Sequence, residues 1–360
     1  MLQNKRLNYI DWFKAIGICL IVIGHCLPAY TLPRTLIYSF HVPLFAFAGG
    51  FLSRPSTTIK DCLKKVVGVF KRMGIPYLIW FIINCYPYMM KECPFKTDYS
   101  FSELLEIFFL LNGRPMWNAA LWFIPCYILV SLVFIFFAYL VKGNKFACLG
   151  LGAAGFTGII ILELTNKTVN IFGYTNIFSM SNALLLLGFY CVGYAIKDLV
   201  KYVVERKESP YKNYMLYIAL GVFITSMIVC ALVNRDATKP GGYYGMSVLN
   251  LNYNNIFVYI SLGIVILISL LLSCALLPSI GSITRLSQSS FFIMATHYLF
   301  FNSPYYTSPS WKEGKWQQSL HTGIKEAFYI ILIYLVVLYV LYKIREKSKI
   351  VSKILMYFGI

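Results

Sequence analysis

The chain has 360 residues, of which 59% are hydrophobic and only 13% are charged, and its formal net charge is +18. A soluble protein has about 25% charged residues, so the composition excludes an ordinary soluble fold and indicates a multi-pass membrane protein. The ten cysteines form no CxxC pair and no cluster with histidine, which excludes a zinc site and a disulfide scaffold.

Apolar stretches are spaced along the whole chain. The first contains Asp11 and Lys14 and is followed by no small-residue cleavage site, so we expect a retained helix and not a signal peptide. The third and ninth stretches fall short of the ~20 residues that a membrane requires, so we expect them to be little tilted, broken or shielded by protein. We predict an all-α polytopic fold with transmembrane helices at about 10–28, 36–53, 75–90, 119–140, 146–165, 177–197, 213–233, 254–277, 289–303 and 324–343.

The charge pattern predicts the topology of these helices. Most of the 32 Lys and Arg residues lie before the first helix, after the last, or in alternate connections. Cytoplasmic loops concentrate basic residues, so both termini are expected in the cytoplasm. Topology thus accounts for the net charge, and the expected partner is the lipid bilayer and not nucleic acid. We expect one domain over residues 1–360, with no fused soluble domain.

Two connections are predicted to form helices that do not span the membrane. In residues 57–72, apolar and basic side chains occupy separate helical faces, which predicts an interfacial helix on the cytoplasmic surface. Its basic face would attract anionic lipid or lie near an anionic cosubstrate. Residues 100–112 begin with a capping box, Ser100 to Glu103, and predict an interfacial or re-entrant helix.

The first helix carries ionisable residues within its apolar run, "KAIGICLIVIGH". Lys14 and His25 lie eleven positions apart, so they share one helical face and are separated by ~16 Å along the axis. Asp11 lies one turn before Lys14 and is placed to neutralise it. Ionisable residues inside a membrane commonly mark a functional site. The alternative is that Asp11 and Lys14 extend to the interface and His25 only bonds a neighbouring helix.

The second helix opens with "SFHVPLFAFAGGF" and places His41 at about the depth of His25. The two histidines are therefore candidates to share a pocket, although a histidine such as His41, taken alone, is more often structural. The small residues that follow, Ala46 to Gly50, predict close packing of this helix on a neighbour.

Five motifs in order resemble the landmarks of the acyltransferase-3 family of bacterial membrane O-acyltransferases. They are "RLNYIDWFKAIGICLIVIGH", "FHVPLFAFAGGFL", "KRMGIPYLIW", "LWFIPCYIL" and "SQSSFFIMATHYLF". The strongest is the basic-X10-His signature, matched by Lys14 and His25. The second motif is most similar to the fucose 4-O-acetylase-like branch.

The resemblance implies transfer of an acetyl group from cytoplasmic acetyl-CoA to a sugar hydroxyl of a cell-envelope glycan or glycolipid, at the inner membrane of a bacterium. His25 would be the general base and Lys14 its basic partner, with Asp11 as the catalytic-site carboxylate that neutralises Lys14. Acetyl-CoA would be a cosubstrate and no cofactor would be bound permanently. Arg72 matches the second of two family arginines, but Val69 replaces the first; Lys14, Lys71 and Arg72 are the expected cosubstrate contacts.

On the acceptor side the candidate residues are His41, Arg114, Trp122 and His297. Trp122 is also consistent with a membrane-interface anchor, and His297 with a structural histidine. Other classes of function stay open, namely a transporter or flippase of a polysaccharide precursor, a structural subunit, and an O-succinyltransferase of the same family. The sequence leaves open the acceptor sugar, the acyl group, the side on which transfer finishes, a homo-oligomer and a separate protein that receives the acyl group.

Overall fold

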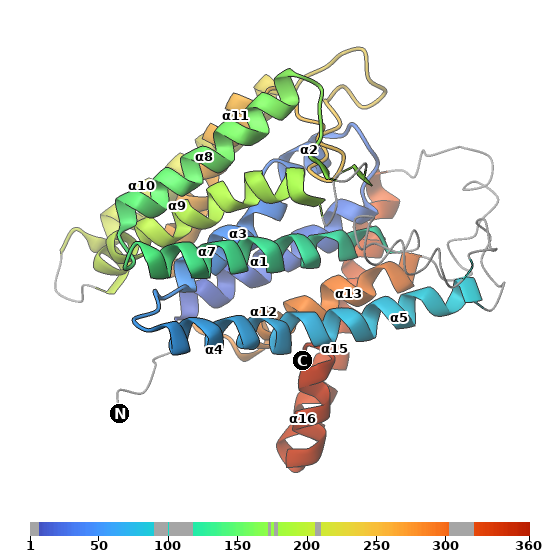
Figure 1. Ribbon diagram of the computed structural model, residues 1–360. Coiled ribbons are helices and arrows are strands. Elements are labelled where there is room, and N and C mark those ends of the chain that lie inside the picture. Colours follow the sequence, from blue (N-terminus) through green and yellow to red (C-terminus); the bar gives the residue numbers. More distant parts are fainter. Residues whose placement is uncertain are drawn as a thin grey trace.

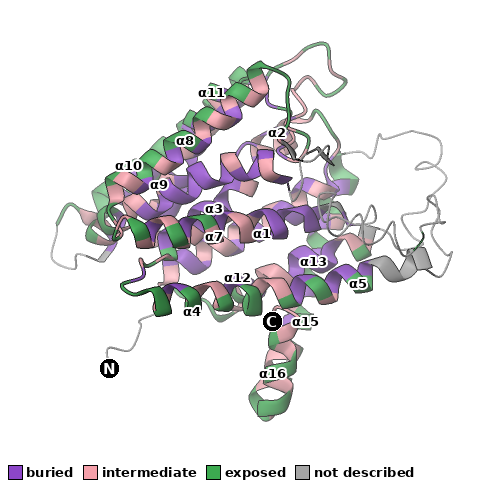
Figure 2. Ribbon diagram, viewed as in Figure 1, coloured by how far each residue is buried: buried purple, intermediate pink, exposed green. Residues whose placement is uncertain are grey.

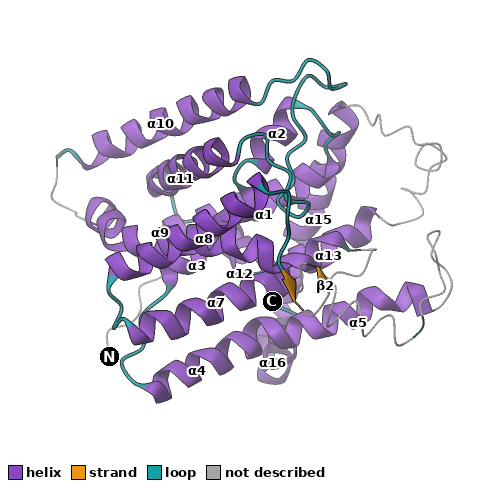
Figure 3. Ribbon diagram, turned by 45° about the horizontal axis from the view of Figure 1, so that its top comes forward, coloured by secondary structure: helices purple, strands orange, loops and turns teal. Residues whose placement is uncertain are grey.

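The computed structural model describes residues 7–89, 100, 118–171, 174–175, 179–205, 210–301 and 320–360. Within these residues the regular elements are helices, apart from one antiparallel pair of two-residue strands, and loops connect them (Figure 3). The predicted all-α fold is therefore confirmed in its class. The elements are α1 (Asn8–Cys26), α2 (Leu32–Tyr38), α3 (His41–Leu52), α4 (Ile59–Val69), η1 (Phe70–Gly74), α5 (Ile75–Met89), η2 (Ala119–Trp122), α7 (Phe123–Leu140), α8 (Lys145–Leu164), β1 (Asn170–Ile171), β2 (Tyr174–Thr175), α9 (Met180–Glu205), α10 (Lys212–Val233), α11 (Ile256–Ser273), η4 (Cys274–Leu276), α12 (Gly281–Gln288), α13 (Ser290–Phe301), α15 (Leu320–Lys347) and α16 (Lys349–Tyr357).

Nine helical stretches in the described part of the chain are long and apolar enough to cross a membrane. Each corresponds to one of the predicted spans, so the protein is a multi-pass membrane protein. The remaining predicted span, 289–303, corresponds to α13, which has only 12 residues and is too short to cross a ~30 Å hydrocarbon core alone. The count of ten spans and the cytoplasmic position of both termini stay predictions.

The segment 57–72 is not separated from the third predicted span. Helix α4 continues through η1, a π-helical turn, into α5, and the three run end to end in Figure 1. Pro76 gives a reason for the wide turn, because its ring would clash with the carbonyl of Arg72 in a regular α-helix. The basic residues of α4 lower its hydropathy, which is why the sequence separates it from the apolar run that follows. Lipid contact by α4 stays a prediction.

The second predicted span, 36–53, is two helices. Helix α2 ends at Tyr38 and α3 begins at His41. Pro43 lies in the first turn of α3, where a proline is tolerated, but it could not continue a helix from α2. The break sets His41 at the first position of a helix, beside the end of α2.

Helices α1, α3 and α9 form the buried centre of the bundle, whereas α10 has a largely exposed surface (Figure 2). Helices α3 and α9 pack at very short range, since a Cβ atom on Gly50 would meet the carbonyl oxygen of Tyr190, and one on Gly193 that of Phe47. The packing role predicted for the small residues of the second span is therefore confirmed. The exposed apolar side chains of α10, such as Ile218, suit contact with lipid tails.

Candidate functional site

Two cavities open on opposite ends of one face of α1. Lys14, Ile18 and Ile21 line a cavity of about 640 Å³. Ile21 and His25 line a second cavity of about 420 Å³. These positions, spaced by four, three and four residues, form a single stripe along the helix. The predicted topology places Lys14 towards the cytoplasm and His25 towards the outside. We therefore call the cavity at Lys14 the inner cavity and the cavity at His25 the outer cavity.

His25 lies among tyrosine hydroxyls and a second histidine. Its Nδ1 atom is 3.1 Å from the hydroxyl of Tyr298 and 3.5 Å from that of Tyr38. The ring of His297 lies 5.2 Å from the His25 ring, centroid to centroid. Because these partners come from α2 and α13, folding of three separate segments is needed to hold the imidazole in one orientation.

An arginine that we did not predict lies in this group. Arg34 of α2 lines the outer cavity and donates from Nη1 to the carbonyl of Leu27, at 2.7 Å. Its Nη2 donates to the hydroxyl of Tyr38, at 3.3 Å. A fixed positive charge thus lies one tyrosine away from His25. The predicted outer cation, Arg114, lies outside the described residues, as does the helix predicted at 100–112 apart from Ser100.

His41 and His297 are both buried, but they are placed differently. His41 lines the outer cavity, and its Nδ1 lies 2.9 Å from the carbonyl of Ile37. A carbonyl only accepts, so Nδ1 carries the proton and Nε2 is the basic nitrogen. His297 directs Nδ1 to the carbonyls of Ile293 and Met294, and it is not among the residues that line either cavity. It lies beside the His25 ring instead.

Trp122 lies in the interior. Its side chain is 5% exposed and it lines the outer cavity, which is not the position of a lipid-facing anchor. The buried amide of Asn118 fixes this region, because Nδ2 donates to the carbonyl of Ala295 at 2.8 Å and Oδ1 accepts from the N–H of Ala120 at 3.2 Å. The start of the span that carries Trp122 is thereby tied to α13, which carries Tyr298.

The segment 244–250 and Asn252 also line the outer cavity. The segment is held to α2 through Thr35, whose hydroxyl donates to the carbonyl of Tyr244 at 3.1 Å. Asn252 crosslinks it from within, accepting from the hydroxyl of Tyr244 and donating to the carbonyl of Gly245. Backbone and amide groups of this kind suit hydrogen bonding to a polar ligand.

The inner cavity is lined by four cationic side chains, Lys14, Arg54, Lys65 and Arg72. Lys71, which we predicted as a contact, is exposed and is not among the lining residues. Arg72 donates from Nε to the carbonyl of Gly68 at 3.2 Å. The concentration of positive charge in the lining of this cavity favours an anionic ligand.

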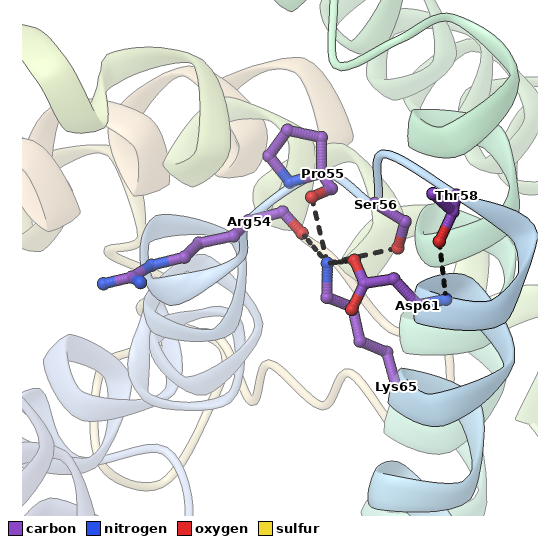
Figure 4. Close-up of polar contacts among 6 residues, drawn as sticks. All are labelled: Arg54, Pro55, Ser56, Thr58, Asp61 and Lys65. Atoms are coloured by element: carbon purple, nitrogen blue, oxygen red, sulfur yellow. Dashed lines mark hydrogen bonds and ion pairs between the residues drawn. The ribbon is translucent and has the colours of Figure 1, made fainter. Parts of the chain in front are cut away.

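Lys65 has a structural part in this cavity (Figure 4). Its ammonium donates to the carbonyls of Arg54 and Pro55, to Ser56 and to the carboxylate of Asp61. These bonds fold the connection between α3 and α4 onto α4. In Figure 4 the side chain of Arg54 extends away from this network, while its carbonyl faces Lys65. Lys65 therefore fixes the backbone that carries Arg54.

Asp11 and Lys14 both form hydrogen bonds with Ser287 of α12. The hydroxyl of Ser287 donates to the carboxylate of Asp11 at 2.8 Å, and the ammonium of Lys14 donates to the carbonyl of Ser287 at 2.8 Å. Asp11 is buried, whereas Lys14 is partly exposed. The two residues thus join α1 to α12 at the inner cavity, and their direct ion pair stays a prediction.

Comparison with known proteins identifies the family of the chain. A family model described as an acyltransferase domain, of the acyltransferase-3 type, matches residues 7–342. Searches of curated proteins and of solved structures found no match. The matched region includes both cavities and almost every described helix. The chain therefore belongs to the acyltransferase-3 family and is a multi-pass membrane enzyme that transfers acyl groups.

Proposed function

We propose that the protein transfers an acetyl group from cytoplasmic acetyl-CoA to a sugar hydroxyl of a cell-envelope glycan or glycolipid, in the inner membrane of a bacterium. The observation that carries this proposal is the stripe on α1, with a cationic cavity at Lys14 and a histidine–tyrosine cavity at His25. Acetyl-CoA has matching parts, namely a phosphorylated nucleotide at one end and an uncharged arm with the thioester at the other. The likeness of "FHVPLFAFAGGFL" to the fucose 4-O-acetylase-like branch supports a sugar acceptor.

The inner cavity would hold the nucleotide. Phosphate oxygens accept strong hydrogen bonds from arginine and lysine, and Lys14, Arg54 and Arg72 line this cavity. Lys65 would act chiefly by holding the backbone of Arg54. The uncharged arm of the cosubstrate would extend along the stripe towards His25, over the ~16 Å given by the helical rise.

The outer cavity would bind the acceptor and carry out the chemistry. With Nδ1–H of His25 donating to Tyr298, Nε2 keeps its lone pair and takes the proton of the attacking hydroxyl. The hydroxyl oxygen bonds to the thioester carbon, and the charge passes to the carbonyl oxygen. Tyr38, polarised by Arg34, is the candidate donor to that oxyanion. When the carbon–sulfur bond breaks, the proton passes from His25 to the CoA thiolate.

The remaining acceptor residues follow from the same geometry. The Nε2 atom of His41 would accept from a sugar hydroxyl, and the Trp122 ring and the Asn250 amide would contact the sugar. His297, beside the His25 ring, would be a positioning residue. Asp11 would fix Lys14 through Ser287 and take no direct part in the transfer.

The test is dependence on acyl-CoA in the purified full chain. We expect free CoA to raise the temperature of thermal unfolding, and acetyl-CoA to be hydrolysed slowly when no acceptor is present, with CoA thiol released. Adding membranes of a deletion strain should accelerate CoA release and label a glycan. A flippase or a structural subunit would respond to neither form of CoA; transport of a glycan precursor without CoA binding would refute the proposal.

A further inference from the structure

The two cavities share four lining residues. Ile21, Phe45, Phe123 and Met294 occur in the lining of both the inner and the outer cavity. They come from α1, α3, α7 and α13, so four different helices contribute one side chain each. We call these four residues the apolar junction.

The apolar junction lies between the cationic and the histidine ends of the site. On α1, Ile21 comes two turns after Lys14 and about one turn before His25. The rings of Phe45 and Phe123 lie 6.3 Å apart, centroid to centroid, in an edge-to-face arrangement. Ile21, Phe123 and Met294 are at most 8% exposed. No side chain of the junction offers a hydrogen bond, apart from the weak thioether acceptor of Met294.

We propose that the apolar junction is an acyl-chain filter, which passes an acetyl thioester and excludes longer or charged acyl groups. This inference rests on the proposed function. If the nucleotide of acyl-CoA binds in the inner cavity and His25 acts in the outer cavity, the acyl group is the leading end of the cosubstrate. It must therefore pass these four side chains before it can react, and its size and charge are tested there.

The physical basis has two parts. A tight apolar site discriminates by about 10- to 200-fold for each added methylene group, so butyryl should be disfavoured against acetyl. A carboxylate enters an apolar site only with a large loss of hydration free energy, so succinyl should be excluded more strongly. The backbone of Met294 is fixed, because its carbonyl accepts from Nδ1 of His297 at 2.8 Å.

Three methionines allow a matched experiment. Met294 lines both cavities, whereas Met73 lines only the inner cavity and Met246 only the outer cavity. The probes are acetyl-CoA, butyryl-CoA and succinyl-CoA, and the measurement is CoA thiol released by the purified full chain without acceptor. We expect M294A to raise the butyryl-to-acetyl ratio of CoA release by about tenfold or more, while M73A and M246A stay within about twofold of the parent.

Truncating buried Met294 removes core packing and could prevent folding of that variant. A second variant at the junction therefore tests the same prediction. Phe45 is only partly buried, and F45L should raise the same ratio in the same direction. Equal ratios in M294A, F45L, M73A and M246A, with normal acetyl-CoA hydrolysis by the parent, would overturn the filter and leave the proposed function standing. A parent that releases no CoA from any of the three thioesters would overturn both. Preferred succinyl-CoA hydrolysis by the parent would overturn the filter and would replace acetyl by succinyl in the proposed function.

Discussion

The inner and outer cavities are built from different kinds of contact. The inner cavity takes its charge from basic side chains near the surface, of which Arg54 and Arg72 are exposed. The outer cavity takes its polarity from a short-range cluster of buried and partly buried rings around His25. Exposed charges attract a ligand from a distance and tolerate small shifts, whereas a buried base depends on exact partners. Changes at the outer cavity should therefore affect turnover, and changes at the inner cavity should affect affinity.

The largest expected effect is at the base. In H25Q, kcat for acetyl transfer should fall by about 10²- to 10⁴-fold, because the proton of the acceptor hydroxyl has no base to receive it. The stabilisation of the protein by CoA should persist, since His25 does not line the inner cavity. The measurement is CoA release together with thermal unfolding.

The control for this variant is H321Q, which changes an exposed histidine of α15 and should behave as the parent. Full turnover in H25Q would show that His25 is not the base, and the catalytic role of the outer cavity would then be wrong.

At the inner cavity, the expected change is in KM. K14Q and R72Q should each raise KM for acetyl-CoA by about tenfold with little change in kcat, because each removes one charged hydrogen bond to the cosubstrate. K71Q is the matched control, since Lys71 is a neighbouring exposed base outside the cavity lining. The measurement is the KM for acetyl-CoA, from steady-state titrations of the parent, K14Q, R72Q and K71Q. Equal KM increases in K71Q and R72Q would indicate general surface attraction.

A smaller effect is expected from the tyrosine that holds the base. Y298F removes the hydroxyl 3.1 Å from Nδ1 of His25, and a neutral hydrogen bond contributes about 1 kcal/mol. We expect kcat to fall about fivefold with KM for acetyl-CoA unchanged. Y329F, at an exposed position of α15, serves as the control. If KM rises instead of kcat falling, Tyr298 binds the cosubstrate and the division between the two cavities is wrong.

The smallest effect should come from the acceptor side. Asn250 lines the outer cavity, whereas Asn254 does not. N250A should slow acetyl transfer to membrane glycan by about threefold through loss of one neutral hydrogen bond. Hydrolysis of acetyl-CoA without acceptor should be unchanged. N254A should alter neither rate, and an equal loss of hydrolysis in N250A would argue for a general effect on folding.

Much of the fold is predictable because its signals are local. Apolar length locates the spans, and helical periodicity places Lys14 and His25 on one face without knowledge of any neighbour. The continuity of α4 with α5 is not predictable, because charges in the first turns of α4 lower its hydropathy. The basic half of a spanning helix and a separate interfacial helix have the same amphipathic pattern.

The missed site residues depend on contacts between distant segments. Arg34 lies in a short connection, "TLPRTL", with nothing to mark it as close to His25. Tyr298 follows His297 directly, and the two point about 100° apart on α13. The sequence offers no means to choose which of them reaches the cavity, and the motif drew attention to the histidine. The packing of α13 against α1 brings Tyr298 into the lining of the outer cavity, with its hydroxyl beside His25.

The π-helical turn η1 links the proline of α5 to the charge of the inner cavity. A π-helical turn contains one residue more than an α-helical turn, so η1 has the geometry of a single-residue insertion absorbed within a continuous helix. Removing one residue between Phe70 and Gly74 would remove the wide turn and bring the Pro76 ring back against a carbonyl of the preceding turn. Arg72 lies within η1 and lines the inner cavity, so the turn that accommodates Pro76 also positions a cationic side chain of that cavity. We therefore expect a one-residue deletion here to weaken donor binding and to leave the residues around His25 in place.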